Sequence, residues 1–310
     1  MPEGRQRLPY VPLGENGVRA IGFVCAGFFI VSCADAAVKW ALPEVGIAAA
    51  MIWRGVFGAL AVAVIAGFRD LRPRNTRLIA ARSGLHTLVS AAYYGAWMLG
   101  MPLAESYAVS SAAPLMMTLL AVPLLGESFG WRRTISTTVG FLGVLIMLRP
   151  GGDLWRPETV MLLFAVAALA LTRIWTRLLA RTDRPETIAF WLMLAHIPAG
   201  LVLLPIFPGP VIIPALPVVA ALVFLGLANG IAHALFARGF AMAPIYSLAP
   251  YEYTPLIWGG ALGYLIWGNV PGWGTIAGAG VVIAAGLYNL HREQLRARER
   301  RLEARTVPAI

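Results

Sequence analysis

The chain has 310 residues, of which 59% are hydrophobic and only 13% are charged, and its formal net charge is +10. Soluble domains are roughly half apolar and a quarter charged, so this composition excludes a soluble fold and makes the lipid bilayer the expected solvent. Runs of about 18 to 25 apolar residues recur along the whole chain and predict ten transmembrane helices. In chain order, these helices are expected at residues 18–39, 45–67, 79–101, 104–125, 131–149, 158–178, 187–206, 214–238, 243–267 and 272–290.

The positions of the basic residues predict the orientation of this all-α integral membrane protein. Ten helices place both termini on the same side, and the segments on that side hold all but four of the 25 basic residues. The exceptions are Lys39, Arg54, Arg149 and Arg156. Both termini are therefore predicted to be cytoplasmic. Because orientation explains the positive charge, no nucleic-acid partner is needed, although a basic tail that binds a protein or anionic lipid remains an alternative.

An internal repeat is visible when residues 104–149 are compared with residues 243–290. Each stretch has tyrosine and serine near its start, then a proline (Pro114 or Pro255), a tryptophan and a glycine-rich final helix. Five helices per repeat give the two halves opposite orientations, which is a common architecture of secondary transporters. The predicted units are residues 1–153 with an N-terminal tail at 1–17, residues 154–290, and a basic cytoplasmic tail at 291–310.

Several stretches together resemble the drug/metabolite transporter superfamily in its ten-helix EamA form. They are CADAAVKW (33–40), MIWRGVFG (51–58), AESYAVSSAAPLMMTLLAVPLLGE (104–127), GFLGVLIMLRPGG (140–152) and LAPYEYTPLIWGGALGYLIWG (248–268). One departure is Gly268–Asn269, where the second half of the family often has Gly-Glu. The resemblance implies a secondary carrier of small metabolites, often an exporter of amino acids or related compounds, with no ATP-binding domain. The sequence contains no GxxxxGK[ST] motif.

Two opposite charges are expected near the middle of the membrane. Arg54 and Glu252 each lie about halfway along their predicted helices, where a charge costs about 2.5 kcal/mol or more. Their equal depth predicts that they pair, either as a structural ion pair or as part of a substrate or proton site. Asp35 and Lys39 are spaced i, i+4 toward the outer end of the first helix, which is compatible with a local ion pair or with a gate.

Polar and aromatic side chains share helical faces elsewhere. His86, Ser90, Tyr93, Tyr94 and Trp97 fall on one face of the third helix, and we interpret them as a cavity wall rather than as interhelix packing. Asn229 and His233 share a face of the eighth helix. The predicted substrate-cavity residues are Asp35, Lys39, Arg54, His86, Tyr93, Tyr94, Trp97, Ser110, Asn229, His233, Tyr251, Glu252 and Tyr253.

Prolines are expected to interrupt the helices that surround this cavity. Pro250 and Pro255 each remove one backbone hydrogen bond, so the ninth helix should be bent or open around Glu252. Broken helices of this kind mark binding sites in inverted-repeat transporters. The predicted hinges are Pro114, Pro250 and Pro255.

The sequence thus favours a secondary transporter of the bacterial inner membrane that works by alternating access. A cavity with opposite charges and aromatic residues suits a zwitterion with an apolar side chain, particularly an aromatic or large apolar amino acid, and the family resemblance implies export of such substrates. The alternative is uptake or exchange of a cationic metabolite such as S-adenosylmethionine.

An intramembrane enzyme or a sensor is disfavoured, because the four histidines fall on separate helices or in the tail and no output domain exists. We expect no catalytic residue, cofactor or metal. The partners are a small-molecule substrate and the bilayer, coupled protons are left open, and the chain is expected to be a monomer or a weak dimer.

Overall fold

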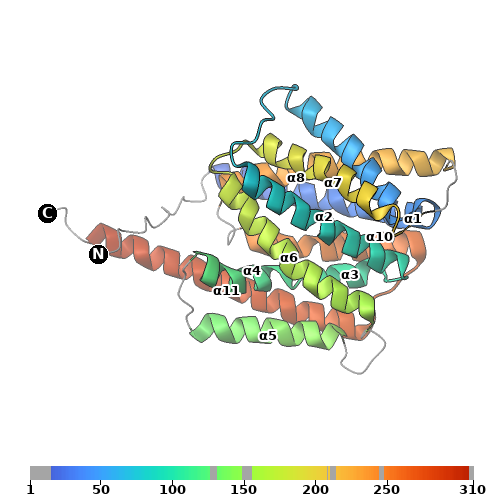
Figure 1. Cartoon of the computed structure of the whole chain (residues 1–310). Coiled ribbons are helices and arrows are strands. Elements are labelled where there is room, and N and C mark those ends of the chain that lie inside the picture. The colour runs from blue at the N-terminus through green and yellow to red at the C-terminus, as the bar shows by residue number, and fades with distance from the viewer. Residues whose placement is uncertain are drawn as a thin grey trace.

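The structure is a computed structural model, and it describes residues 15–125, 131–148, 156–207, 209, 214–243 and 248–306. Within these residues all regular structure is helical, as predicted (Figure 1). The helices are α1 (Glu15–Ile65), α2 (Thr76–Met98), α3 (Leu103–Ser110), α4 (Ala113–Leu125), α5 (Trp131–Leu148), α6 (Pro157–Leu179), α7 (Pro185–Leu203), α8 (Leu216–Met242), the short 3₁₀ helix η1 (Ala249–Tyr253), α10 (Thr254–Trp267) and α11 (Trp273–Thr306).

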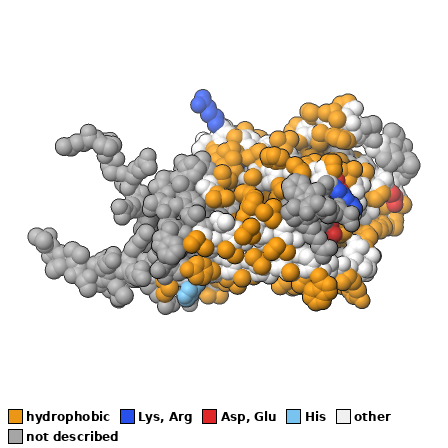
Figure 2. Space-filling view, turned by 90° about the horizontal axis from the view of Figure 1, so that it is seen from below, with side chains coloured by type: hydrophobic (Ala, Val, Ile, Leu, Met, Phe, Trp, Pro, Cys, Tyr) orange, Lys and Arg blue, Asp and Glu red, His pale blue; other side chains and the backbone are white. Residues whose placement is uncertain are grey.

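The surface of the protein is suited to lipid. Large apolar side chains such as Phe164, Leu216 and Leu265 are exposed, and Figure 2 shows hydrophobic side chains spread over the described surface with few charges among them. Four stretches in the described part of the chain are long and apolar enough to cross a membrane: Gly17–Ile65, Pro157–Leu179, Pro185–Leu203 and Leu216–Met242. The prediction of an integral membrane protein is therefore confirmed. The count of ten crossings and the inverted repeat stay predictions.

Helix α1 consists of two helices that meet at Gly46. A straight helix of its 51 residues would be about 76 Å long at 1.5 Å per residue. Gly46 breaks it with φ 74° and ψ 171°, a backbone conformation that favours glycine because it has no Cβ. The sequence predicted the break at residues 40–44, but the chain stays helical through Pro43. The predicted first and second transmembrane helices are thus the two parts of α1.

The helices pack as neighbours that are distant in sequence. Helix α1 lies against α7 and α8, α2 against α6 and α7, and α5 beside α11 along one edge of the bundle (Figure 1). The close approach of α1 and α8 relies on glycine, because a Cβ on Gly226 or Gly230 would meet the backbone of Trp53 or Gly58 within 3 Å. Small residues allow such close helix contacts in membrane proteins.

The predicted hinge prolines lie at the beginnings of helical segments. Pro114 is the second residue of α4, Pro250 the second of η1 and Pro255 the second of α10. Proline is tolerated there because the first backbone N–H groups of a helix have no intrahelical acceptor. The expected interruption around Glu252 is present, since η1 carries this residue directly before α10. Movement at these prolines stays a prediction.

Replacing Gly230 by alanine should destabilise the protein. The added Cβ would lie 2.5 Å from the carbonyl oxygen of Gly58 and 3.0 Å from the Cβ of Ala61. Because a helix backbone cannot move aside locally, we expect a loss on the order of 1–3 kcal/mol. The matched control is Gly22→Ala, whose Cβ would meet nothing within 4 Å. Thermal unfolding of the detergent-purified variants measures both changes, and equal midpoints would contradict the packing argument.

Candidate functional site

A pocket lies inside the helix bundle. Its wall is formed by residues of α1, α2, α3, α6, α8, η1 and α10. Asp35 and Arg54 both line it, although nineteen residues of straight helix would separate them by about 28 Å. The break at Gly46 therefore turns the two parts of α1 so that both face the same space.

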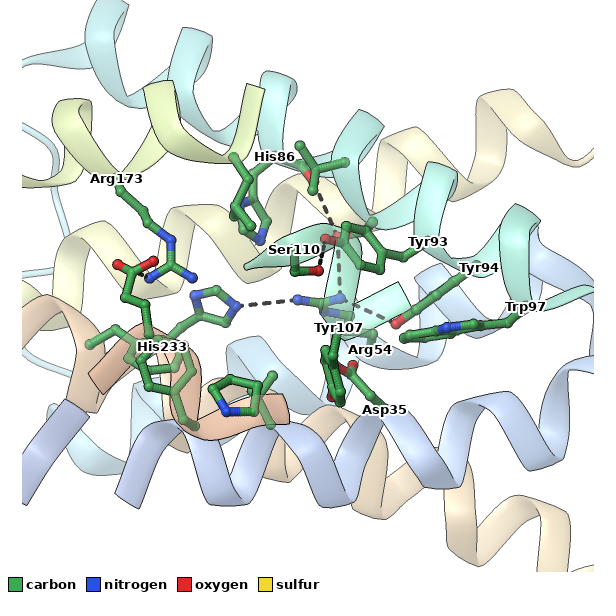
Figure 3. Close-up of a pocket in the computed structure, with 18 residues that line it drawn as sticks. Asp35, Arg54, His86, Tyr93, Tyr94, Trp97, Tyr107, Ser110, Arg173 and His233 are labelled. Atoms are coloured by element: carbon green, nitrogen blue, oxygen red, sulfur yellow. Dashed lines mark hydrogen bonds and ion pairs between the residues drawn. The ribbon is translucent and has the colours of Figure 1, made fainter. Parts of the chain in front are cut away.

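Many of the residues predicted from the sequence meet at this pocket. Those that line it are Asp35, Arg54, His86, Tyr93, Tyr94, Trp97, Ser110, His233, Glu252 and Pro255. The side chains of α2 that were predicted to share a face, Ser90 among them, all contribute to one wall (Figure 3). Their geometric convergence is thus established, whereas their role in binding a substrate stays a prediction.

Other predicted residues lie outside the pocket wall. Asn229 is fully buried and donates to the carbonyl oxygen of Leu225 on its own helix at 2.9 Å. Tyr253 is buried, and Tyr251 packs against the apolar cluster around Phe236. Pro114 is buried in α4, and the side chain of Pro250 lies outside the described atoms.

The proposed ion pair between Asp35 and Lys39 does not form. The Lys39 ammonium donates to the carbonyl oxygen of Met101 and lies 5.4 Å from the centre of the Trp267 ring. Asp35 accepts a hydrogen bond from the Tyr107 hydroxyl, with 2.7 Å between the oxygens. Residues spaced i, i+4 share a helix face, but each of these side chains forms its hydrogen bond with a residue outside α1. The prediction of a local ion pair is therefore wrong, and the alternative of a gate stays a prediction.

Arg54 is surrounded by neutral hydrogen-bonding groups. Its side chain is buried, at 4% exposure. One terminal nitrogen, Nη1, lies 3.2 Å from both Ser90 Oγ and Tyr94 Oη, and Nη2 lies 3.3 Å from His233 Nε2 (Figure 3). Among the described residues, no carboxylate oxygen lies within 4 Å of this guanidinium.

Three histidines from different helices gather beside Arg54. The ring of His86 lies 5.0 Å from that of His233 and 6.3 Å from that of His196, measured between centroids. His196 Nε2 is 3.0 Å from Ser90 Oγ, which joins α7 to the same network. The sequence assigned these residues to separate helices, and tertiary structure brings them together. In the described part of the chain, no group of histidine, cysteine or acidic side chains is arranged to hold a metal ion.

Glu252 pairs with Arg173, not with Arg54 as the equal-depth argument predicted. Arg173 Nη1 lies 2.5 Å from Glu252 Oε1, and only 2% of the Glu252 side chain is exposed. The Arg173 guanidinium also lies 5.3 Å from the centre of the Phe28 ring. The sequence placed Arg173 among the cytoplasmic arginines, but its long side chain extends along α6 into the pocket. The local signal that would have found it is its position within the apolar run of α6.

Two further arginines assigned to the cytoplasmic side also turn inward. Arg82 is buried, and its Nε donates to Thr176 Oγ1 at 3.0 Å. Arg177 donates to the carbonyl oxygens of Phe240 and Ala243, at 2.6 and 2.5 Å, and so holds the last turn of α8. The positive-inside rule counts such residues correctly but does not say which of them fold back between helices.

Aromatic side chains form one wall of the pocket. The Tyr94 and Trp97 rings stack with centroids 5.8 Å apart, and Tyr93 meets Trp97 edge to face at the same distance. Hydrogen bonds hold this wall, because Tyr93 pairs with Ser110 and Trp97 Nε1 donates to Ser106 Oγ at 3.0 Å. Such a combination of apolar rings with a few fixed polar groups is typical of small-molecule sites.

Part of the sequence matches a known protein family. Residues 18–149 match the EamA-like transporter family. The chain is also similar to a solved crystal structure, with a TM-score of 0.65 and 20% sequence identity, and the match covers 90% of this chain and 99% of that one. This likeness concerns the fold alone.

Curated relatives carry transporter names. The chain is 28% identical over 178 residues to the S-adenosylmethionine uptake transporter of Rickettsia prowazekii (strain Madrid E), a match that covers 56% of this chain. That match spans 60% of the relative's length. The chain is 26% identical to a riboflavin transporter of Rhizobium johnstonii, over 66% of this chain and 68% of that protein. A riboflavin transporter of Brucella anthropi is 23% identical over 87% of this chain and 96% of its own length.

Removing one partner of the Arg173–Glu252 pair should cost more stability than removing both. Glu252→Gln leaves a largely buried guanidinium without its counter-charge, which typically costs about 3–5 kcal/mol. Arg173→Gln likewise leaves the buried Glu252 carboxylate without its counter-charge. The double variant Arg173→Gln/Glu252→Gln should therefore be more stable than the sum of the single changes predicts. Thermal unfolding in detergent measures this coupling, and strictly additive effects would rule the pair out as a unit.

Proposed function

This chain is a member of the EamA-like transporter family within the drug/metabolite transporter superfamily, and on that premise we propose that it is a secondary transporter of small metabolites. The observation that carries this proposal is the pocket inside the bundle. It combines buried charges of both signs with an aromatic wall, and residues from both halves of the chain line it. A solute held there would sit between the elements that alternating access has to move.

We further propose that the chain crosses the membrane ten times, in two inverted repeats with both termini in the cytoplasm. On this assignment α6 and α7 correspond to the two parts of α1, α8 to α2, α10 to α3–α4, and α11 to α5. The packing supports it, because α2 lies against α6 as α8 lies against α1, and α5 lies against α11. Proposed counterparts therefore make equivalent contacts.

The leading substrate class is amino acids with aromatic or large apolar side chains, moved outward across a bacterial inner membrane. The rings of Tyr93, Tyr94 and Trp97 offer an apolar surface, while Arg54 and Asp35 offer opposite charges in the same space. S-adenosylmethionine, moved inward or exchanged, is the second candidate, favoured by the name of the Rickettsia relatives. It shares the amino-acid group and adds an aromatic ring system and a positive charge.

Flux measurements on the purified protein in liposomes test this proposal. We expect saturable uptake of labelled phenylalanine, tryptophan or leucine that excess unlabelled substrate blocks, with protein-free liposomes as the control. S-adenosylmethionine and riboflavin complete the panel, and each solute is run with and without a proton gradient. Acceleration by the gradient would identify proton coupling. Absence of flux for all twenty amino acids would remove the leading class, and flux of S-adenosylmethionine alone would establish the second candidate.

A further inference from the structure

Two charged side chains of the pocket wall, Arg54 and Asp35, have no ion-pair partner within 4 Å among the described residues. Among the described residues, Arg54 is hydrogen-bonded only to Ser90, Tyr94 and His233. Asp35 accepts a hydrogen bond from the neutral Tyr107 hydroxyl. No ion pair within 4 Å involves either side chain among the residues that the structure describes. A charge withdrawn from water is costly unless it is paired, so this arrangement requires compensation from another source.

The other charges that line the pocket already have partners. Glu252 and Arg173 form their own ion pair, with 2.5 Å between the nearest atoms. Within the pocket wall, the remaining charged groups are therefore Asp35 and Arg54 alone. They lie more than 4 Å from each other and line the same pocket, so a solute that carries both a negative and a positive charge has an opposite charge on the wall for each.

Arg54 retains unused hydrogen-bond donors. A guanidinium has five N–H groups, and the three contacts to Ser90, Tyr94 and His233 use three of them. The Nε atom is buried and has no partner. Arginine is suited to carboxylates because two parallel N–H groups can bind both oxygens at once. Figure 3 shows the guanidinium held between His233 and Tyr94, on the side of the pocket where Tyr107 and Asp35 lie.

We propose that Arg54 and Asp35 form the head-group site for an α-amino acid, with Arg54 binding the carboxylate and Asp35 binding the ammonium group. This assignment rests on the proposed transport function and names the residues that recognise its substrate. Tyr107 holds the Asp35 carboxylate in place through its 2.7 Å hydrogen bond. The side chain of the amino acid then lies against the aromatic wall of Tyr93, Tyr94 and Trp97.

Solutes that lack one charge test this assignment in the unmodified protein. Phenylalanine carries both charges, phenylalaninamide lacks the carboxylate, and 3-phenylpropionate lacks the ammonium group. Isothermal titration of the detergent-purified full chain should show that phenylalanine binds at least about tenfold more tightly than either analogue, because each analogue loses a hydrogen-bonded contact to one charged group. Equal affinities would overturn the head-group site whether or not any variant folds.

Variants then assign each charge to its residue. Arg54→Gln should weaken phenylalanine binding about tenfold and leave the binding of phenylalaninamide, which lacks the carboxylate, nearly unchanged. Asp35→Asn should also weaken phenylalanine binding about tenfold, and it should leave the binding of 3-phenylpropionate, which lacks the ammonium group, nearly unchanged. A merely structural role would weaken all three solutes together and would overturn the assignment. Arg54→Lys should recover part of the phenylalanine affinity. The matched controls are Arg77→Gln on α2 and Glu44→Gln on α1, which neutralise exposed charges and should alter no affinity.

Binding and flux together separate this inference from the proposed function. Flux of phenylalanine that does not depend on its two charges overturns the head-group site and leaves the transporter proposal intact. Absence of phenylalanine and S-adenosylmethionine binding overturns the head-group site, and absence of flux for all twenty amino acids overturns the amino-acid substrate class as well. S-adenosylmethionine is titrated in parallel because it carries the same amino-acid group.

Discussion

The guanidinium of Arg54 has to be stabilised away from water, and much of the bundle is organised around that requirement. Its hydrogen bonds reach α2 through Ser90 and Tyr94 and α8 through His233. Ser90 extends the network to His196 on α7. Four helices are thus joined through one buried cation, in a setting where lipid offers no replacement partners. The apolar packing of α1 against α8 brings these polar groups together, and the polar groups in turn fix how the helices are rotated.

Hydropathy predicts the membrane class of this protein because it depends on composition averaged over some twenty residues. It locates the apolar stretches within α1, α6, α7 and α8, but it does not locate the breaks. The chain could have turned at Leu42–Glu44, where proline and a charge coincide, yet it turns at Gly46 because the required φ of 74° favours glycine. The interruption around Glu252 was predicted from Pro250 and Pro255, since proline acts on the backbone locally, but its form as the short helix η1 was not.

Sequence spacing placed side chains on the correct helix face where a single helix determines the answer. Spacing along α2 places His86, Tyr93 and Trp97 on one face, and that face lines the pocket. It failed for partners on different helices. Depth along a helix can be counted from the sequence, but rotation about the helix axis cannot, so equal depth assigned Arg54 to Glu252 although Arg173 is the partner. Long arginine side chains add to this uncertainty because they reach well beyond their own turn.

Asp35 and Arg54 belong to one helical element and lie on opposite sides of its break at Gly46. Any change of the backbone angle at Gly46 therefore alters the separation of the two charges while both parts of α1 remain intact. Gly209 packs against this point, since a Cβ on Gly46 would lie 3.0 Å from its Cα. The distance between the Asp35 and Arg54 charges thus depends on a backbone dihedral angle outside the pocket wall. A side chain added at Gly46 or Gly209 would change that distance without touching a bound solute.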